Sequence, residues 1–268
     1  MGYHTYQHSP QACVIEGMSS PSSSSSSAKN PDGLICYEDA IKYWTSVEPS
    51  VNGVLGGYGE STSVPKADIV GSLTFVRRLR NRFSNEPGKI KYGLDLGAGI
   101  GRVTKNFMHT VCDKVDLLEP VKPFVEKMKI ELQPLMKQGK IGEILEISMQ
   151  DWVPEEPGRY YLIWCQWCCG QLPDADFLKW MDNCRLALQK GGMMVVKENN
   201  ATGTENNDIY DPVDSSKTRT DANFRALFRK AGWKILSTTR QRGMPPELYP
   251  IRMYALQPME EEEEVEYE

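Results

Sequence analysis

Three glycines flanked by charged residues stand near the middle of the chain, in a run that could hold a ligand against its backbone. Asp95 precedes Gly97, Gly99 and Gly101, and Arg102 follows them. The run comes after a short apolar segment and opens a helical pattern. It should therefore lie at the carboxyl end of a sheet, where glycines let a ligand approach the main chain. Its G-x-G-x-G spacing differs from the G-x-G-x-x-G of dinucleotide-binding proteins.

Other polar residues stand at the ends of the next expected strands. Glu119 ends the second strand, about twenty residues after the glycines, where an acid can accept both hydroxyls of a ribose. Gln150 and Asp151 end the expected third strand, beside the position of an adenine. Glu119 alone could be a surface carboxylate, but the order of these features favours a bound nucleoside.

These features, with the turn 186–192, resemble the cofactor site of class I S-adenosylmethionine-dependent methyltransferases. In that turn Lys190 replaces the proline usual in the superfamily. The resemblance implies S-adenosylmethionine as the cofactor and S-adenosylhomocysteine as the product. It also implies an α/β, Rossmann-like fold whose seven-stranded sheet is mostly parallel and ends in an antiparallel hairpin.

Hydrophobic patterning supports this architecture, because strands alternate with helices from Lys91 onward, as in a parallel sheet covered on both faces. Strands 233–240 and 249–257 have no helix between them and should pair as an antiparallel hairpin. A helix at 124–133 should end at Pro134. The other expected strands are 92–96, 114–118, 144–147, 160–165 and 192–197, and the other expected helices are 36–44, 69–83, 103–109, 177–188 and 222–231.

Several segments resemble a narrower family, the protein α-N-terminal methyltransferases. These enzymes modify proteins that begin with a small residue followed by Pro-Lys once the initiator Met is removed. The resemblance spans about residues 36–257 and leaves out both tails. The matching segments are 43–44, the glycine-rich 53–59, 94–102, I-W-C-Q-W at 163–167, V-K-E-N at 196–199 and V-D-S-S at 213–216.

The resemblance assigns one set of residues to the cofactor. In that set Arg102 pairs with the methionyl carboxylate, for which a guanidinium fork is the natural partner. The full set is Gly97, Gly99, Arg102, Glu119, Pro120, Val121, Met149, Gln150 and Gln166.

A second set is implied for the peptide and the chemistry. Two tryptophans would pack around the second-position proline, a lid would close over the peptide, and polar residues would hold the first carbonyl, the α-amine and the lysine ammonium. The implied peptide-binding residues are Tyr43, Trp44, Leu55, Gly56, Trp167, Asp211 and Ser216. The implied catalytic residues are Asn199 on the first carbonyl, Asp214 on the α-amine and Gln171.

The chain departs from this family at two positions. The family usually has a histidine four residues after I-W-x-Q-W, and here the position is Gln171. Glutamine cannot take a proton, so we predict that Asp214 accepts any proton and that Gln171 orients it. A peptide α-amine has a pKa near 8, so about a fifth is neutral near pH 7.4 and a strong base is optional. Pro212 stands where a second carboxylate is common, which predicts a weaker lysine pocket.

Each assignment has a plainer alternative. Trp44 and Trp167 could be core aromatics, Asn199 could be a turn residue, and Asp214 to Ser216 could be a turn or a helix N-cap. Two rival functions also stand: a small-molecule N-methyltransferase on the same scaffold, and a non-catalytic module that binds S-adenosylmethionine. The glycine-rich segment 52–59, which we expect to be a loop, and the acidic segment 208–216 favour an open peptide groove.

Composition excludes other classes. A net charge of −5 argues against nucleic acid as the main partner, and no apolar run reaches the roughly 18 residues of a membrane span. Seven cysteines and no export signal predict reduced thiols in the cytoplasm or the nucleus. Cys165, Cys168 and Cys169 lack a second ligand pair, so we expect no metal site. A monomer is favoured.

The sequence divides into four parts. Residues 1–33 form a serine-rich tail that should be disordered, and 34–90 form an N-terminal helical lid. Residues 91–257 form the methyltransferase domain, and 258–268 form an acidic tail that should also be disordered.

Overall fold

A seven-stranded sheet forms the centre of the computed structural model, which describes residues 31–202 and 207–260. The strand order is β3-β2-β1-β4-β5-β9-β8. The first five strands pair in parallel, and β9 pairs antiparallel with both β5 and β8. The strands are β1 (Tyr92–Leu96), β2 (Lys114–Leu118), β3 (Ile141–Leu145), β4 (Tyr160–Gln166), β5 (Leu188–Asn199), β8 (Trp233–Arg240) and β9 (Ile251–Pro258). The predicted class I architecture, with its antiparallel C-terminal hairpin, is confirmed.

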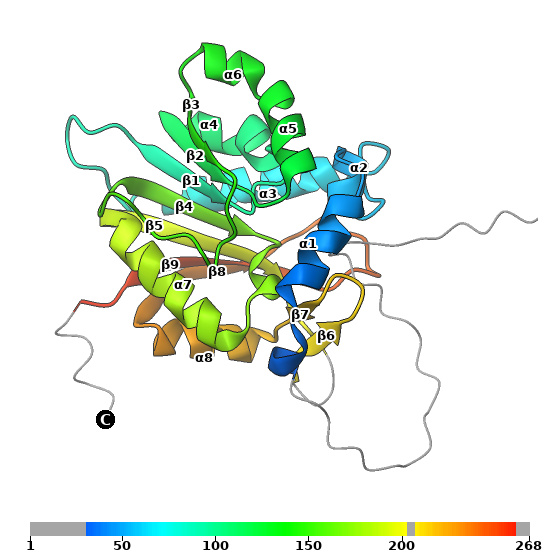
Figure 1. Cartoon of the computed structure of the whole chain (residues 1–268). Helices are drawn as coiled ribbons and strands as arrows, with labels where there is room; N and C mark the ends of the chain where they lie inside the picture. The colour runs from blue at the N-terminus through cyan, green and yellow to red at the C-terminus, as the bar shows by residue number, and fades with distance from the viewer. Residues whose placement is uncertain (1–30, 203–206, 261–268) are drawn as a thin grey trace, which may run out of the picture.

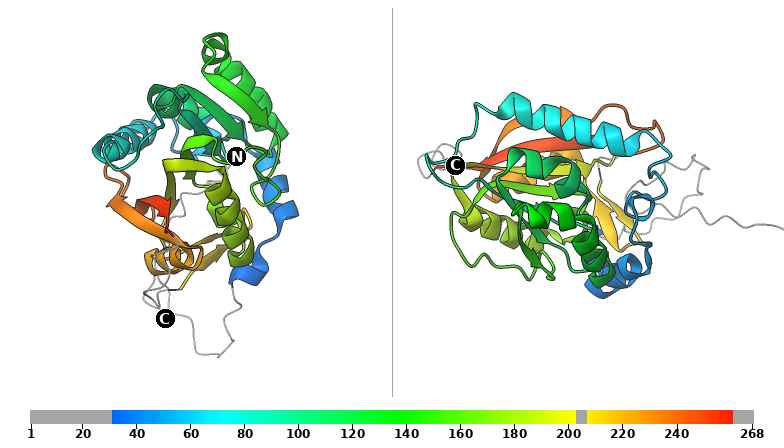
Figure 2. Two further views of the ribbon diagram at one scale, coloured as in Figure 1. Left: turned by 90° about the vertical axis from the view of Figure 1, so that its left-hand side faces the viewer. Right: turned by 90° about the horizontal axis from the view of Figure 1, so that it is seen from above.

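Helices cover both faces of this sheet, as Figures 1 and 2 show. On one face α7 (Asp174–Ala187) and α8 (Asp221–Lys230) bury apolar side chains in one cluster with Ile163 and Cys165 of β4. On the other face α3 (Val64–Leu79) and α5 (Lys122–Glu131) pack around Leu162 and Trp164 of the same strand. All seven residues of β4 are buried, which explains why its sequence is apolar without alternation.

The N-terminal extension is helical, and Figure 1 shows α1 on the same side of the molecule as the β6–β7 hairpin. Its elements are η1 (Pro31–Leu34), α1 (Tyr37–Ser46), α2 (Val51–Val54) and α3. The hairpin pairs β6 (Ile209–Asp211) with β7 (Ser216–Thr218). The sequence did not predict it, because each strand has only three residues.

Several local predictions were wrong. Residues 31–33, expected to be disordered, belong to η1, which Asp32 ties to the hairpin. Residues 52–54, the first part of the loop expected at 52–59, belong to the one-turn helix α2 (Val51–Val54), because Ser50 caps it by accepting from the Gly53 N–H. Pro134 does not end a helix but lies in the first turn of α6 (Gln133–Lys137).

The third strand also lies earlier than predicted. It ends at Leu145, so Gln150 and Asp151 lie in a turn after it rather than at its end. The helix expected at 103–109 is a π-helix, η2 (Thr104–Met108), followed by α4 (His109–Val111). The acidic tail, expected to be disordered from residue 258, begins with ordered residues: Pro258 belongs to β9, and the Met259 N–H donates to the Gly232 carbonyl at 2.9 Å. The rest of the two predicted tails, 1–30 and 261–268, lies outside the described residues. Among the residues described, no helix is long and apolar enough to span a membrane.

Candidate functional site

A cleft opens at the carboxyl ends of the parallel strands, and all nine residues predicted for the cofactor line it. They follow four strands: Gly97, Gly99 and Arg102 after β1, Glu119 to Val121 after β2, Met149 and Gln150 after β3, and Gln166 at the end of β4. The empty space of the cleft is about 960 Å³, a volume that includes space open to solvent.

The turn after β1 requires glycine at its centre. Gly97 has a φ of 62°, and a Cβ there would lie 2.5 Å from the Cβ of Cys168. Gly99 also lies in the left-handed region, with a φ of 56°. Side chains at these two positions would strain the backbone and fill the floor of the cleft. The turn is therefore shaped as a cradle for a bound group.

Glu119 ties this turn to the start of α5. Its Oε2 accepts from the Gly99 N–H at 2.8 Å, and its Oε1 accepts from the Val121 N–H at 2.9 Å. Burial raises its pKa to about 7, against the lowering effect of those two N–H groups. Each oxygen keeps a lone pair for another donor, so the carboxylate fits two vicinal hydroxyls of a ribose.

Arg102 lines the same cleft but already has a partner inside the protein. Its Nη1 donates to Asp68 Oδ2 at 2.6 Å, and its guanidinium lies 5.7 Å from the ring centroid of Trp167. Sequence reasoning missed Asp68. Its only signal was a single aspartate inside the apolar pattern of α3, and surface helices carry many such residues.

A second, smaller pocket adjoins the cleft and is acidic. It is lined by predicted residues from β5, the 3-10 helix η3 (Cys169–Gln171) and the hairpin: Gln171, Asn199, Asp211, Asp214 and Ser216. Gln171 lines both spaces. The structure therefore brings the predicted catalytic set to one wall of the cofactor cleft.

Asp214 lies in this pocket and accepts three hydrogen bonds from protein groups. Its Oδ1 accepts from the N–H and the hydroxyl of Ser216 at 3.2 and 2.6 Å, and its Oδ2 accepts from Gln171 Nε2 at 3.3 Å. Burial raises its pKa to about 6, and Asp211 adds to that shift while Ser216 and Gln171 oppose it. Glu198, which sequence reasoning did not assign, lines the same pocket, and burial raises its pKa to about 7.

Two buried polar atoms at the junction have no hydrogen-bond partner among the described residues. They are Trp167 Nε1, a donor, and Gln171 Oε1, an acceptor. Trp167 also has a left-handed backbone, with a φ of 55°. Buried polar atoms are nearly always paired, and strained non-glycine residues collect at functional sites. Both atoms are thus available to a ligand at this junction.

The predicted peptide-binding aromatics divide between the cleft and the hairpin. Trp44 lines the cleft and packs edge-on against Phe124, with the ring centroids 6.2 Å apart. Burial, together with the nearby carboxylates of Asp214 and Asp211, raises the pKa of Tyr43 to about 12. Tyr43 is therefore close to these carboxylates, but it lines neither the cleft nor the acidic pocket.

Leu55 and Gly56 do not line either space. Leu55 is 5% exposed and packs in a cluster with Val64, Trp167 and Ile251. Gly56 follows it in a left-handed turn, with a φ of 59°. In this structure the lid predicted from these two residues is packed against Trp167, behind the wall of the cleft.

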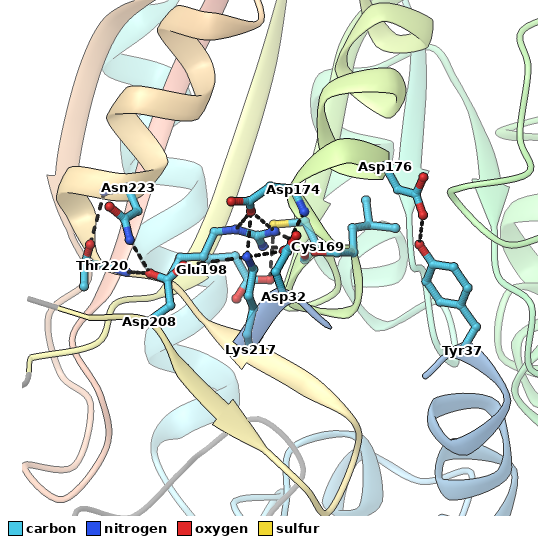
Figure 3. A network of polar contacts seen from close by, with 12 residues as sticks. Asp32, Tyr37, Cys169, Asp174, Asp176, Glu198, Asp208, Lys217, Thr220 and Asn223 are labelled. Atoms are coloured by element: carbon cyan, nitrogen blue, oxygen red, sulfur yellow. Dashed lines mark hydrogen bonds and ion pairs between the residues drawn. The ribbon is translucent and has the colours of Figure 1, made fainter. Parts of the chain in front are cut away.

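A charged network fixes the hairpin, as Figure 3 shows. Lys217 Nζ donates to Asp32 and Asp174, each at 2.6 Å, and the Cys36 N–H donates to Ser215 Oγ at 2.8 Å. Asp214 and Ser215 therefore lie in a hairpin turn, and the helix N-cap considered for them is wrong. Sequence reasoning missed Asp32 and Lys217, since their pairing joins residues far apart in the chain.

The cysteines near the cleft are paired with protein groups. Cys165 and Cys168 lie 3.4 Å apart, sulfur to sulfur, and the Cys168 thiol donates to the Leu96 carbonyl at 3.2 Å. Burial raises the pKa of Cys169 to about 11. Over residues 31–202 and 207–260, no group of three His, Cys, Asp or Glu side chains could hold a metal ion.

The sheet order and the cleft at its carboxyl edge define a class I S-adenosylmethionine-dependent methyltransferase. A solved S-adenosylmethionine-dependent methyltransferase from Leishmania major has the same fold, with a TM-score of 0.72 and 37% identity over 82% of each chain. Residues 32–257 match the family model described as AdoMet dependent proline di-methyltransferase. The chain belongs to this family.

Curated relatives cover most of the chain. The α N-terminal protein methyltransferase 1 of Schizosaccharomyces pombe is 42% identical over 224 residues, which are 83% of this chain and 96% of the relative. The N-terminal Xaa-Pro-Lys N-methyltransferase 1 of Xenopus tropicalis is 37% identical over 82% of this chain and 94% of its own length. The family match over residues 32–257 includes both pockets.

Proposed function

We propose that the chain transfers methyl groups from S-adenosylmethionine to the α-amine of proteins that begin with a small residue, Pro and Lys. The observation that carries this proposal is the junction at Gln171, where the cofactor cleft meets the acidic pocket of Asp214. A carboxylate at that junction can hold a cationic N-terminus beside the methyl donor. The names of the relatives point the same way.

The residues of the cleft fit the cofactor. Glu119 would take the ribose hydroxyls, Arg102 and Gln166 would hold the methionyl end, and Met149 and Gln150 would flank the adenine. The bound cofactor supplies an activated methyl group on a sulfonium. The protein has to align the acceptor nitrogen with that methyl and exclude other orientations.

The second pocket and the adjoining wall of the cleft together fit the peptide. Trp44 and Trp167 offer apolar walls for the proline, and Asn199 lies in the pocket where it could bond the first carbonyl. Asp211 and Ser216 would take the lysine ammonium. Lys217, a buried cation in the same pocket, adds to the effect of Pro212, and we infer a weaker preference for lysine at the third position.

Proton release falls to Asp214. Gln171 is neutral and donates its amide to Asp214, so it orients the carboxylate without accepting a proton. With a pKa of about 6, Asp214 is ionised near neutral pH and can attract the ammonium form of the substrate. The ammonium first gives a proton to Asp214 or to water. The neutral amine then attacks the methyl carbon, and the C–S bond breaks to leave S-adenosylhomocysteine.

Mass spectrometry of a Ser-Pro-Lys-Arg peptide incubated with the protein and S-adenosylmethionine tests this function. An N-acetylated copy and a copy with alanine in place of proline serve as controls. Methyl masses on the free, proline-containing peptide alone are the expected result, and their number gives the extent of methylation. If cofactor binds and no copy gains mass, the acceptor is a small molecule.

Where the protein acts is also a proposal. We infer a monomer that works in the cytoplasm, and in the nucleus as well, on protein N-termini rather than on nucleic acid. Ribosomal proteins are the proposed substrates. Light scattering at micromolar concentration tests the monomer, and fractionation with N-terminal proteomics of cells lacking the protein tests the location and the substrates.

A further inference from the structure

Asp68 lies fully buried in α3, at the centre of a polar cluster behind the cofactor cleft. It accepts hydrogen bonds from three side chains of three other elements. Arg102 Nη1 donates at 2.6 Å, Gln166 Nε2 donates at 2.9 Å, and Lys197 Nζ donates to the same oxygen as Gln166. Asp68 itself is not among the residues that line the cleft.

These contacts leave Gln166 and Arg102 little freedom. The Gln166 amide is fixed at both ends, because its Oε1 accepts from Trp164 Nε1 at 3.0 Å while its Nε2 donates to Asp68. Arg102 uses one nitrogen of its fork on Asp68, which leaves other donors of the fork for a ligand. Both residues line the cleft, so Asp68 sets the direction in which the cleft presents its donors.

The cluster also contains more positive than negative side chains. Arg102 and Lys197 are 8% and 0% exposed and share the single carboxylate of Asp68. Burial lowers the pKa of Lys197, yet its Nζ also donates to the Asp68 carbonyl at 3.1 Å and to Ser72 Oγ at 3.0 Å, which suits the charged form. Two cations and one anion leave a surplus positive charge beside the cleft, and buried charge is costly unless it is paired.

We propose that Asp68 is a positioning residue that holds Arg102 and Gln166 for the methionyl end of the cofactor, whose carboxylate completes the charge balance of the cluster. This inference rests on the cofactor site proposed above. It predicts that replacing Asp68 weakens the binding of the amino-acid part of the cofactor and leaves the binding of its adenosine part unchanged. A residue that only stabilised the fold would affect both parts alike.

Binding calorimetry with two ligands separates these roles. S-adenosylhomocysteine carries the amino-acid part, and 5′-methylthioadenosine has the same adenosine and sulfur without it. For Asp68→Asn we expect the Kd of S-adenosylhomocysteine to rise about tenfold or more, the effect of one misplaced charge-assisted contact. The Kd of 5′-methylthioadenosine should stay within about twofold.

The matched control is Asp116→Asn. Asp116 is also 0% exposed and pairs with a cation, Arg159 at 2.9 Å, but it does not line the cleft. The Asp116→Asn variant should bind both S-adenosylhomocysteine and 5′-methylthioadenosine with the Kd values of the native protein. If Asp68→Asn leaves two buried cations that prevent folding, Asp68→Asn with Lys197→Met removes one of them, and the same selective loss is expected.

The outcomes distinguish the two proposals. If the folded Asp68 variants bind S-adenosylhomocysteine as the native protein does, or weaken both ligands equally, the role of Asp68 is overturned while the cofactor site stands. If the native protein binds both ligands equally well, the methionyl contacts themselves are wrong, and the failure belongs to the proposed site.

Discussion

Asp214 gives a prediction at the scale of a single residue. Its raised pKa of about 6 means that its carboxyl group is neutral in acid and charged above that pH. Attraction to a substrate ammonium, whose own pKa is near 8, should therefore be strongest near pH 7 and be lost as the pH falls through 6. Peptide Kd values measured by fluorescence anisotropy between pH 5 and 8 should show this inflection.

The control is Asp214→Asn, which cannot ionise. It should bind the peptide weakly at every pH, with no inflection near 6, and kcat/KM should fall about 100-fold or more, as when one charge-stabilising contact is removed. An inflection that persists in this variant would assign the titration to Glu198, the other carboxyl group of the pocket with a raised pKa.

The sequence could predict those site residues that belong to contiguous motifs. Gly97, Glu119 and Asp214 belong to short runs or strand ends whose role follows from their place. Asp68 and Lys217 could not be found in this way. Their burial comes from partners 34 and 185 residues away, Arg102 and Asp32, and a lone charged residue resembles any surface residue until the fold brings those partners to it.

At the scale of elements, the one-turn helix α2 should be sensitive to its central glycine. A Cβ at Gly53 would lie 2.1 Å from the Glu48 carbonyl oxygen, so Gly53→Ala must displace the turn and with it Val54, which lines the cleft. Small displacements at a site are costly to rate, and we expect kcat/KM to fall about tenfold. Steady-state kinetics with a Pro-Lys peptide checks this.

The free energy of unfolding of Gly53→Ala should change much less than its kcat/KM, because α2 packs outside the two large cores of the sheet. The control is Gly33→Ala, where a Cβ would meet nothing within 4 Å. Equal losses of activity in both variants would show that the turn geometry is not responsible.

The contact between η1 and the hairpin gives a second element-scale prediction. Asp32 and Asp174 share Lys217, so Asp32→Asn weakens the hold on the hairpin without freeing the lysine. A partly exposed charge-assisted bond contributes about 1 kcal/mol, so the peptide KM should rise about fivefold. Asp39→Asn, an exposed position on α1, should not change it, and a rise in both would point to general loss of acidic charge.

At the scale of the whole molecule, patterning was enough to predict a parallel sheet with an antiparallel C-terminal hairpin, though not the order of the strands across the sheet. Buried strands, glycine turns and the missing helix before β9 specify that topology through local signals. Boundaries such as those of α2, α6 and β3 were wrong because capping by Ser50, or pairing of Ile141 with Val115, decided them. Those contacts cannot be read from residue types alone.

The family match and both pockets lie within residues 31–260. A protein limited to these residues should therefore keep its Kd for S-adenosylhomocysteine and its kcat/KM on a Pro-Lys peptide within about twofold, since ordering costs outside the site do not enter either value. Calorimetry and kinetics beside the full chain measure this. A large loss would mean that one tail takes part in substrate capture.

The closeness of Cys168 to the cradle has a practical consequence. Its sulfur side chain lies against Gly97 and lines the cleft, and among the described cysteines only it and Cys36 are partly exposed. A bound cofactor should cover Cys168 and leave Cys36 open. Peptide mapping can follow the rate at which a small alkylating reagent labels Cys168, with Cys36 as the internal reference. This rate would measure cofactor occupancy without any enzymatic turnover.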